Sequence, residues 1–117
     1  MKKRFLVLAT VLAVVLSISA HAATPRAVLV LPALSFNGTT ANCTVRINGN
    51  TSSDTISATI ELLEGSTSVE TWTVSGTGYV YFTDTASATK NKTYTLNVDA
   101  VVNGKAYPTA SISQKCS

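Results

Sequence analysis

The sequence contains very little histidine, methionine and tryptophan, and charged residues make up only 13% of its 117 residues. The single histidine, His21, lies in an N-terminal segment that we interpret below as a cleaved leader. Without histidine, the remaining chain cannot build a Ser-His-Asp triad, a histidine metal site or a histidine pH switch. We therefore expect a protein that is not an enzyme and that uses no cofactor and no metal.

The charge balance excludes a second class of function. Three of the nine Lys and Arg residues lie at positions 2–4, so the rest of the chain carries six basic and six acidic residues. A neutral chain lacks the positive field that nucleic-acid binding needs, and we expect no nucleic-acid partner. Glu61 and Glu70 could lie across one hairpin, but such carboxylates are ordinarily solvated surface residues rather than a glycosidase pair.

The N-terminus has the pattern of a secretory signal peptide. A positive segment, Met1–Arg4, precedes an apolar run, Phe5–Ile18, and residues 20–22 form a small-x-small cleavage signal. We expect cleavage after Ala22, which divides the chain into a signal peptide, residues 1–22, and a mature domain, residues 23–117. The apolar run is short for a spanning helix, so we expect no membrane span after cleavage. The predicted location is extracellular, periplasmic or at the cell envelope, and the leader looks bacterial.

The two cysteines, Cys43 and Cys116, both belong to the predicted mature domain. An even number of cysteines in an exported chain predicts one disulfide, Cys43–Cys116, with two free thiols as the alternative. A metal site is disfavoured because two thiols without histidine supply too few ligands.

The mature segment is rich in Thr, Ser, Val and Ile, with Gly or Asn at regular intervals, and has no sustained helical periodicity. β-branched residues favour strands, and regular turn residues between them indicate an antiparallel β-sandwich. The sequence therefore predicts an all-β domain with seven antiparallel strands, which cover residues 27–36, 41–48, 55–63, 68–74, 79–83, 93–102 and 105–114.

Two of these predicted strands contain proline and should lie at sheet edges, because proline donates no ladder hydrogen bond. Pro32 belongs to strand 27–36, whose continuous apolar run we also expect to be largely covered, and Pro108 belongs to strand 105–114. In strand 68–74, Val69 and Trp72 are three positions apart, so their side chains would point to opposite sides of a regular strand. We expect Trp72 in the core, and a β-bulge would allow both apolar side chains to point inward.

An immunoglobulin-type strand order fits these features. It places the first, second and fifth predicted strands in one sheet and the third, fourth, sixth and seventh in the other. Cys43, near the start of strand 41–48, and Cys116, after strand 105–114, then lie at the same end of the sandwich, with inward parity. Both proline-containing strands fall at sheet edges in the same order.

Residues 90–105, a strand with an alternating apolar pattern followed by Asn103-Gly104, resemble the sixth strand and hairpin of fibronectin type III and related immunoglobulin-like modules. The resemblance implies that Tyr94 forms a tyrosine corner, in which its hydroxyl bonds backbone a few residues upstream. The overall plan is also similar to small secreted bacterial proteins with a lone immunoglobulin-like domain, a resemblance that implies no activity.

Tyr79 and Tyr81 share the outward parity of strand 79–83. Two explanations stay open: tyrosine suits the exposed side of a strand, or the pair binds a protein or a glycan. The loops 48–54, 75–78 and 84–92 are alternative binding surfaces. We expect a monomeric binding or surface-interaction module. The alternatives are a structural subunit of a surface fibre or pilus and a secreted toxin or inhibitor.

Overall fold

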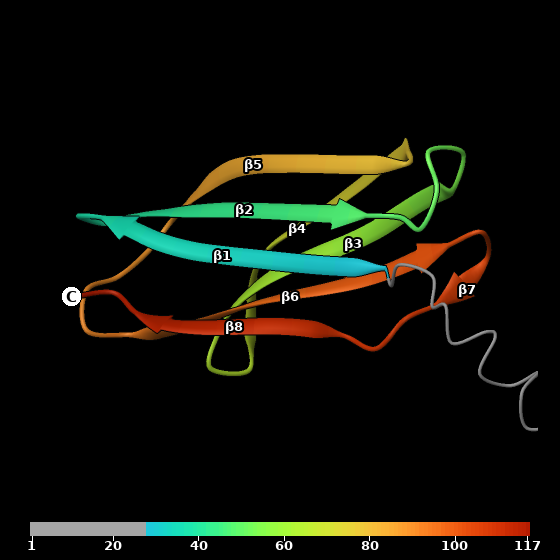
Figure 1. Ribbon diagram of the computed structural model, residues 1–117. Coiled ribbons are helices and arrows are strands. Elements are labelled where there is room, and N and C mark those ends of the chain that lie inside the picture. Colours follow the sequence, from blue (N-terminus) through green and yellow to red (C-terminus); the bar gives the residue numbers. More distant parts are fainter. Residues whose placement is uncertain (1–27) are drawn as a thin grey trace, which may run out of the picture.

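A computed structural model describes residues 28–117, and in this part the regular structure consists of β-strands without any helix (Figure 1). The all-β prediction is confirmed. The predicted signal peptide, residues 1–22, lies outside the described residues. Between residues 28 and 117 there is no helix long and apolar enough to cross a membrane. The strands are β1 (Leu29–Asn37), β2 (Thr40–Asn48), β3 (Thr55–Glu64), β4 (Thr67–Thr77), β5 (Tyr79–Ser87), β6 (Thr93–Val102), β7 (Lys105–Ala106) and β8 (Ala110–Lys115).

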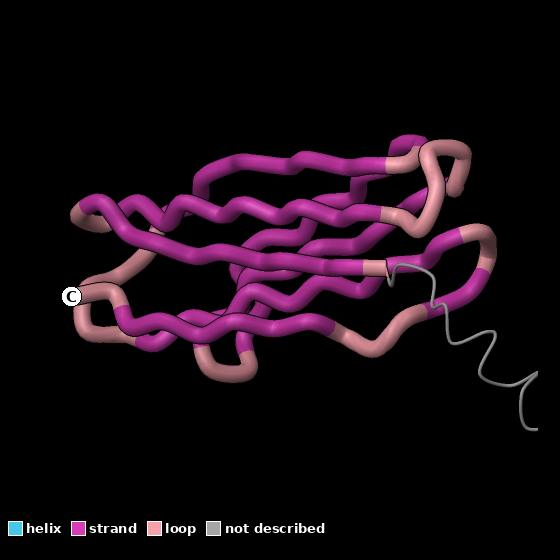
Figure 2. The backbone as a smooth tube through the Cα atoms, in the orientation of Figure 1, coloured by secondary structure: helices cyan, strands magenta, loops and turns pink. Residues whose placement is uncertain are grey.

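The strands form two antiparallel sheets that pack face to face as a sandwich (Figure 2). One sheet has the order β1-β2-β5; in the other, β4, β3 and β6 follow one another, and both β7 and β8 pair with β6. This division of the strands between the sheets is the predicted one. Pro32 lies on β1, which pairs only with β2 among the described strands and is therefore an edge strand of this sheet.

The predicted count of seven strands is wrong because strand 105–114 is interrupted. The Tyr107 N–H still donates to the Ala100 carbonyl at 2.9 Å, but Pro108 has no N–H with which to continue the ladder. Pairing with β6 resumes at Ala110, so one predicted strand becomes β7 and β8.

The core consists of the inward positions of both sheets, as the alternating pattern predicts. The inward side chains of β2, β3 and β6 are buried; they are Ala41, Cys43, Val45, Ile47, Ile56, Ala58, Ile60, Leu62, Tyr94, Leu96, Val98, Ala100 and Val102. Aromatic contacts join the sheets: the ring centroids of Phe36 and Tyr94 are 5.6 Å apart, and those of Trp72 and Phe82 are 5.2 Å apart. Trp72 packs against the core but is only partly buried.

The predicted bulge is present between β3 and β4. Leu62 pairs with Glu70 and Leu63 pairs with Ser68, so Val69 is the extra residue on β4. The bulge does not bring Val69 into the core: Val69 is exposed, whereas Trp72, three positions later, packs against the core.

The connection from β4 to β5 differs from the expected flexible turn at residues 75–78. Strand β4 continues to Thr77, and one residue, Gly78, carries the chain to the other sheet with a φ of +77°. A Cβ atom at Gly78 would stand 2.7 Å from the Ser52 carbonyl oxygen, so this crossing requires glycine. The predicted loop 84–92 is also shorter, because β5 continues to Ser87 along β2.

Candidate binding surface on the three-stranded sheet

The outer side of the β1-β2-β5 sheet, which faces away from the core, carries a cluster of large exposed side chains. Leu29, Leu31, Tyr79 and Tyr81 are each about half exposed, and they are four of the five exposed large hydrophobic residues between residues 28 and 117. Strand pairing brings them together with Arg46 in two adjacent cross-strand rows. We call these five residues the outer-face patch.

The first row of the patch runs from Leu31 through Arg46 to Tyr81, and the second runs from Leu29 through Asn48 to Tyr79. Positions two apart on a strand point to the same side, so both rows face solvent together. The expectation that the continuous apolar strand 27–36 would be largely covered is wrong for its outward half. Leu29 and Leu31 are each 49% exposed because no element packs over this sheet within residues 28–117.

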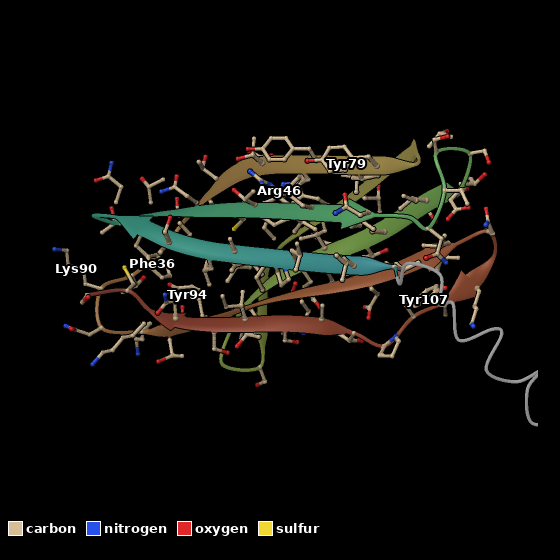
Figure 3. The ribbon with its side chains drawn as sticks, in the orientation of Figure 1. Phe36, Arg46, Tyr79, Lys90, Tyr94 and Tyr107 are labelled. Carbon is tan, nitrogen blue, oxygen red and sulfur yellow. The ribbon has the colours of Figure 1, made fainter. Side chains whose placement is uncertain are left out.

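Arg46 is the cation of the outer-face patch. Its guanidinium carbon lies 5.4 Å from the centroid of the Tyr81 ring, which places it in a cation–π contact. Figure 3 shows Arg46 reaching from β2 towards β5, the strand that carries Tyr79. Among the described residues, no carboxylate forms an ion pair with Arg46. The N–H groups of Arg46 are therefore available to a ligand.

A shallow depression of about 400 Å³ lies beside Arg46 on the same surface. Its wall is mixed, with apolar groups, an aromatic ring, a hydroxyl and the guanidinium; the lining residues are Leu31, Pro32, Ala33, Thr44, Arg46 and Tyr81. Thr44 and Thr83 continue the surface in the next row, where their hydroxyl oxygens are 3.5 Å apart. The depression therefore offers both an apolar floor and hydrogen-bonding groups.

The outer side of the other sheet has a different chemistry. Its own depression, of about 350 Å³, is lined mainly by short polar side chains of β3 and β4, among them Ser57, Thr59, Thr73 and Ser75. Asp99 also lines it and accepts a short hydrogen bond from the Thr109 hydroxyl. Of the exposed large hydrophobic residues between residues 28 and 117, this sheet carries one, Val69 on β4.

A hydrogen-bonded node centred on Asp54 fixes the end of the sandwich next to the patch. The Asp54 carboxylate accepts from the Thr51 hydroxyl at 2.7 Å, from the Asn103 amide at 3.1 Å, and from the backbone N–H groups of Asn50 and Thr51. The Thr51 hydroxyl, followed by the Asn103 amide, lowers the pKa of Asp54 to about 2. The carboxylate is thus charged at all ordinary pH values.

The same node positions the start of β5. The Gly78 N–H donates to the Asp54 carbonyl at 2.7 Å, and the Gly49 N–H donates to the Gly78 carbonyl at 3.0 Å. Tyr79 follows Gly78 directly, so its place in the patch depends on this backbone network. The hairpin residue Asn103, with a φ of +53°, belongs to the predicted Asn103-Gly104 turn.

Tyr94 lies at the opposite end of the sandwich (Figure 3). Its side chain is buried, and its hydroxyl accepts a 2.7 Å hydrogen bond from the backbone N–H of Thr89, five residues upstream. The hydroxyl also donates to the Glu64 carboxylate at 3.3 Å. These bonds tie β6 to the connection that arrives from β5.

The predicted Cys43–Cys116 disulfide is not formed: both cysteines are free and buried. The Cys116 thiol donates to the carbonyl of Gly38, in the turn between β1 and β2, at 3.3 Å. Cys43 lies three residues inside β2, which is about 10 Å along the strand from its first residue. Both cysteine side chains are fully buried. Burial, together with the nearby Asp84 carboxylate, raises the pKa of Cys43 to about 11.

In residues 28–117, no three His, Cys, Asp or Glu side chains gather in a way that could hold a metal ion. A comparison with protein-family models and a comparison with curated proteins both find no match for the chain.

Sequence reasoning singled out Tyr79 and Tyr81 but missed Leu29, Leu31 and Arg46. Their parity was visible, since Leu29 and Leu31 alternate along one strand and Arg46 alternates with buried residues on the next. The sequence alone did not show the register that aligns β1, β2 and β5. The alternative loops 48–54 and 75–78 support the patch through the Asp54 node and the Gly78 crossing.

Proposed function

We propose that the protein is a secreted, noncatalytic immunoglobulin-like module that binds a partner through the outer-face patch. The observation that carries this proposal is the gathering of Leu29, Leu31, Tyr79 and Tyr81 around an Arg46 without an ion-pair partner in the described residues. Exposed aromatic residues and arginine are the side chains most often found at the energetic centres of binding sites. The strand order of the two sheets supports the immunoglobulin-like assignment.

The neighbouring Asp54 node holds part of the patch in a fixed conformation, so the binding surface is preorganised. Tyr79 is held by a backbone network, and both tyrosines stand on a regular strand rather than on a loop. Binding groups on a rigid scaffold lose less conformational freedom when a ligand arrives. This arrangement suits recognition, since it presents a fixed surface.

A binding experiment with matched variants tests the proposal. The labelled protein would be applied to panels of immobilised glycans and extracellular proteins, together with a Tyr79→Ser, Tyr81→Ser double variant and a Val69→Ser control. Val69 is the fifth exposed large hydrophobic residue and lies on β4, in the other sheet. We expect specific binding that the double variant loses and the control keeps. Equal binding by all three proteins would contradict the proposal, as would the absence of any binding by the parent protein.

A second candidate function, a subunit of a surface fibre, rests on the edge strand β5. Within the described residues β5 pairs only with β2, has nine residues and carries one charge, Asp84. A long edge strand with few charges can pair with another chain. Sedimentation over a wide concentration range distinguishes the two: a fibre subunit should associate, and a Thr83→Pro substitution on β5 should reduce the association.

A further inference from the structure

We infer that the depression beside Arg46 binds an acidic sugar, a uronate unit within an oligosaccharide. This inference rests on the proposed function, because it names the ligand class of the same surface. Three properties of the patch support it: its aromatic rings, its unpaired cation and its size.

The aromatic part of the patch suits a sugar ring. Tyr79 and Tyr81 are two positions apart on β5, so their Cα atoms are about 7 Å apart. A pyranose has an apolar side made of C–H groups and an edge made of hydroxyl groups. The C–H side can lie against a tyrosine ring, while the hydroxyl edge needs polar partners. Asn48 and Thr44, on the middle strand, provide such partners next to the rings.

The charge of the patch selects an anionic ligand. Arg46 is the only charged residue among the outward positions of β1, β2 and β5. Its guanidinium lies over the Tyr81 ring and has no carboxylate partner among residues 28–117. A guanidinium that stacks on a ring keeps its N–H edge free for a two-bond contact with a carboxylate. A uronate presents a carboxylate on the same ring that carries the apolar side.

The size of the patch favours an oligosaccharide over a protein. The five residues of the patch span three strands in one direction and two outward positions in the other, or about 10 Å by 7 Å. A stable protein interface uses roughly 20–30 residues on each partner, many more than the five residues of the patch. The depression beside Arg46, of about 400 Å³, is shallow and similar in size to the depression on the other sheet, so its volume alone does not distinguish the two surfaces.

A second copy of this chain fits the patch poorly. In a symmetric dimer the same surface meets itself. Arg46 lies on the middle strand, and a symmetric contact centred on this residue would bring two guanidinium groups together. Like charges brought together in this way oppose association.

The test is a titration of the purified, isotope-labelled protein, followed by amide chemical shifts and calorimetry. The probes are hexamers of galacturonate and mannuronate and hyaluronan oligosaccharides, each beside its carboxyl-reduced, neutral form. We expect at least one acidic oligomer to bind at least tenfold more tightly than its neutral form, with shifts confined to β1, β2 and β5. Raising the salt concentration should weaken this binding.

Variants assign the binding to the patch. Arg46→Gln should weaken binding of the acidic oligomer at least tenfold and weaken binding of the neutral form much less, so that the preference for the acidic form is lost. Tyr81→Ser should weaken both, and Val69→Ser should match the parent protein. Thermal unfolding of each variant checks that the fold is intact.

Failure of this inference is distinguishable from failure of the proposed function. If no acidic oligomer binds, or Arg46→Gln has no effect on binding, the acidic-sugar inference is wrong. A protein, or a neutral glycan bound at least as tightly as its acidic form, that binds through Tyr79 and Tyr81 would overturn it too, but would leave the proposed function standing. Self-association that Tyr81→Ser abolishes would favour a second copy as the occupant. Binding unaffected by any change in the patch would overturn both proposals.

Discussion

The two outer sides of this sandwich are built on the same alternating strand pattern but carry different side chains. The β1-β2-β5 sheet exposes leucine, tyrosine and one arginine, whereas the larger sheet exposes mainly serine and threonine. On the larger sheet the polar groups satisfy one another: the Thr95 and Ser113 hydroxyls are 2.8 Å apart, and the Ser111 hydroxyl donates to Asn97 at 2.6 Å. Tyrosine and threonine both favour strands, so strand formation does not explain the difference. The polar groups of the larger sheet are bonded to one another, while the smaller sheet exposes large apolar side chains and an arginine that forms no ion pair among the described residues.

The largest effect should come from the interior that both outer sides share. Ile60, on the central strand β3, is fully buried, and Ile60→Ala should lower the free energy of unfolding by about 2–5 kcal/mol. The neighbouring Thr59 points to the outer side, and Thr59→Ala should change stability by about 0.5 kcal/mol or less. Denaturant unfolding measures both. Similar costs for the two variants would contradict the assignment of interior and exterior.

A smaller effect should come from Tyr94, which joins the two sheets at one end. Tyr94→Phe removes the acceptor of the Thr89 N–H and should lower stability by about 1–2 kcal/mol. Tyr107→Phe removes the same atom from a half-buried ring at the other end and should cost less. If the two variants lose the same free energy of unfolding, the Tyr94 hydroxyl does not stabilise the connection between β5 and β6.

The Asp54 node joins the sheets at the end next to the patch, and its effect should depend on pH. The folded protein lowers the pKa of Asp54 from 3.8 to about 2, so the charged carboxylate stabilises the fold at pH values above about 4. This contribution should decrease as the pH falls from about 4 through 2, because the unfolded chain takes up the proton first. Urea unfolding between pH 2 and 6 should show a weaker pH dependence for Asp54→Asn than for the parent protein. Identical slopes would show that Asp54 is not the group responsible.

Much of the fold could be predicted from local patterns. The alternation in β2, β3 and β6 identified their buried side chains, and the phase of Val69 against Trp72 indicated the bulge. The strand ends were harder to predict because tertiary pairing decides them. Thr77 and Ser87 lie in predicted loops, yet both pair with a neighbouring strand.

The candidate site was only half predictable. Outward parity identified Tyr79 and Tyr81, but the cross-strand rows that add Leu29 and Arg46 depend on a register that no local signal contains. The disulfide prediction failed for a related reason. Parity and direction brought Cys43 and Cys116 to the same end of the sandwich, but they do not determine how deep each thiol lies.

Replacing the two tyrosines of the patch should change stability the least and should remove binding through the patch. Tyr79→Thr with Tyr81→Thr gives the smaller sheet the side-chain chemistry of the larger one. Both tyrosines are half exposed and threonine favours strands equally, so the free energy of unfolding should fall by about 1 kcal/mol or less. Binding through the patch should nevertheless be lost, as measured by calorimetry with the ligand that the parent protein binds.

The reverse exchange sharpens the comparison. Thr73→Tyr with Ser75→Tyr places two tyrosines at outward positions two apart on β4, an edge strand of the larger sheet. The rows around them supply hydroxyls but no arginine, since Thr59 and Ser57 are their partners on β3. We expect this variant, with Tyr79 and Tyr81 already replaced, to fold and not to regain binding. Recovery of binding would mean that a tyrosine pair alone is sufficient, and that the cation and the leucines of the smaller sheet are dispensable.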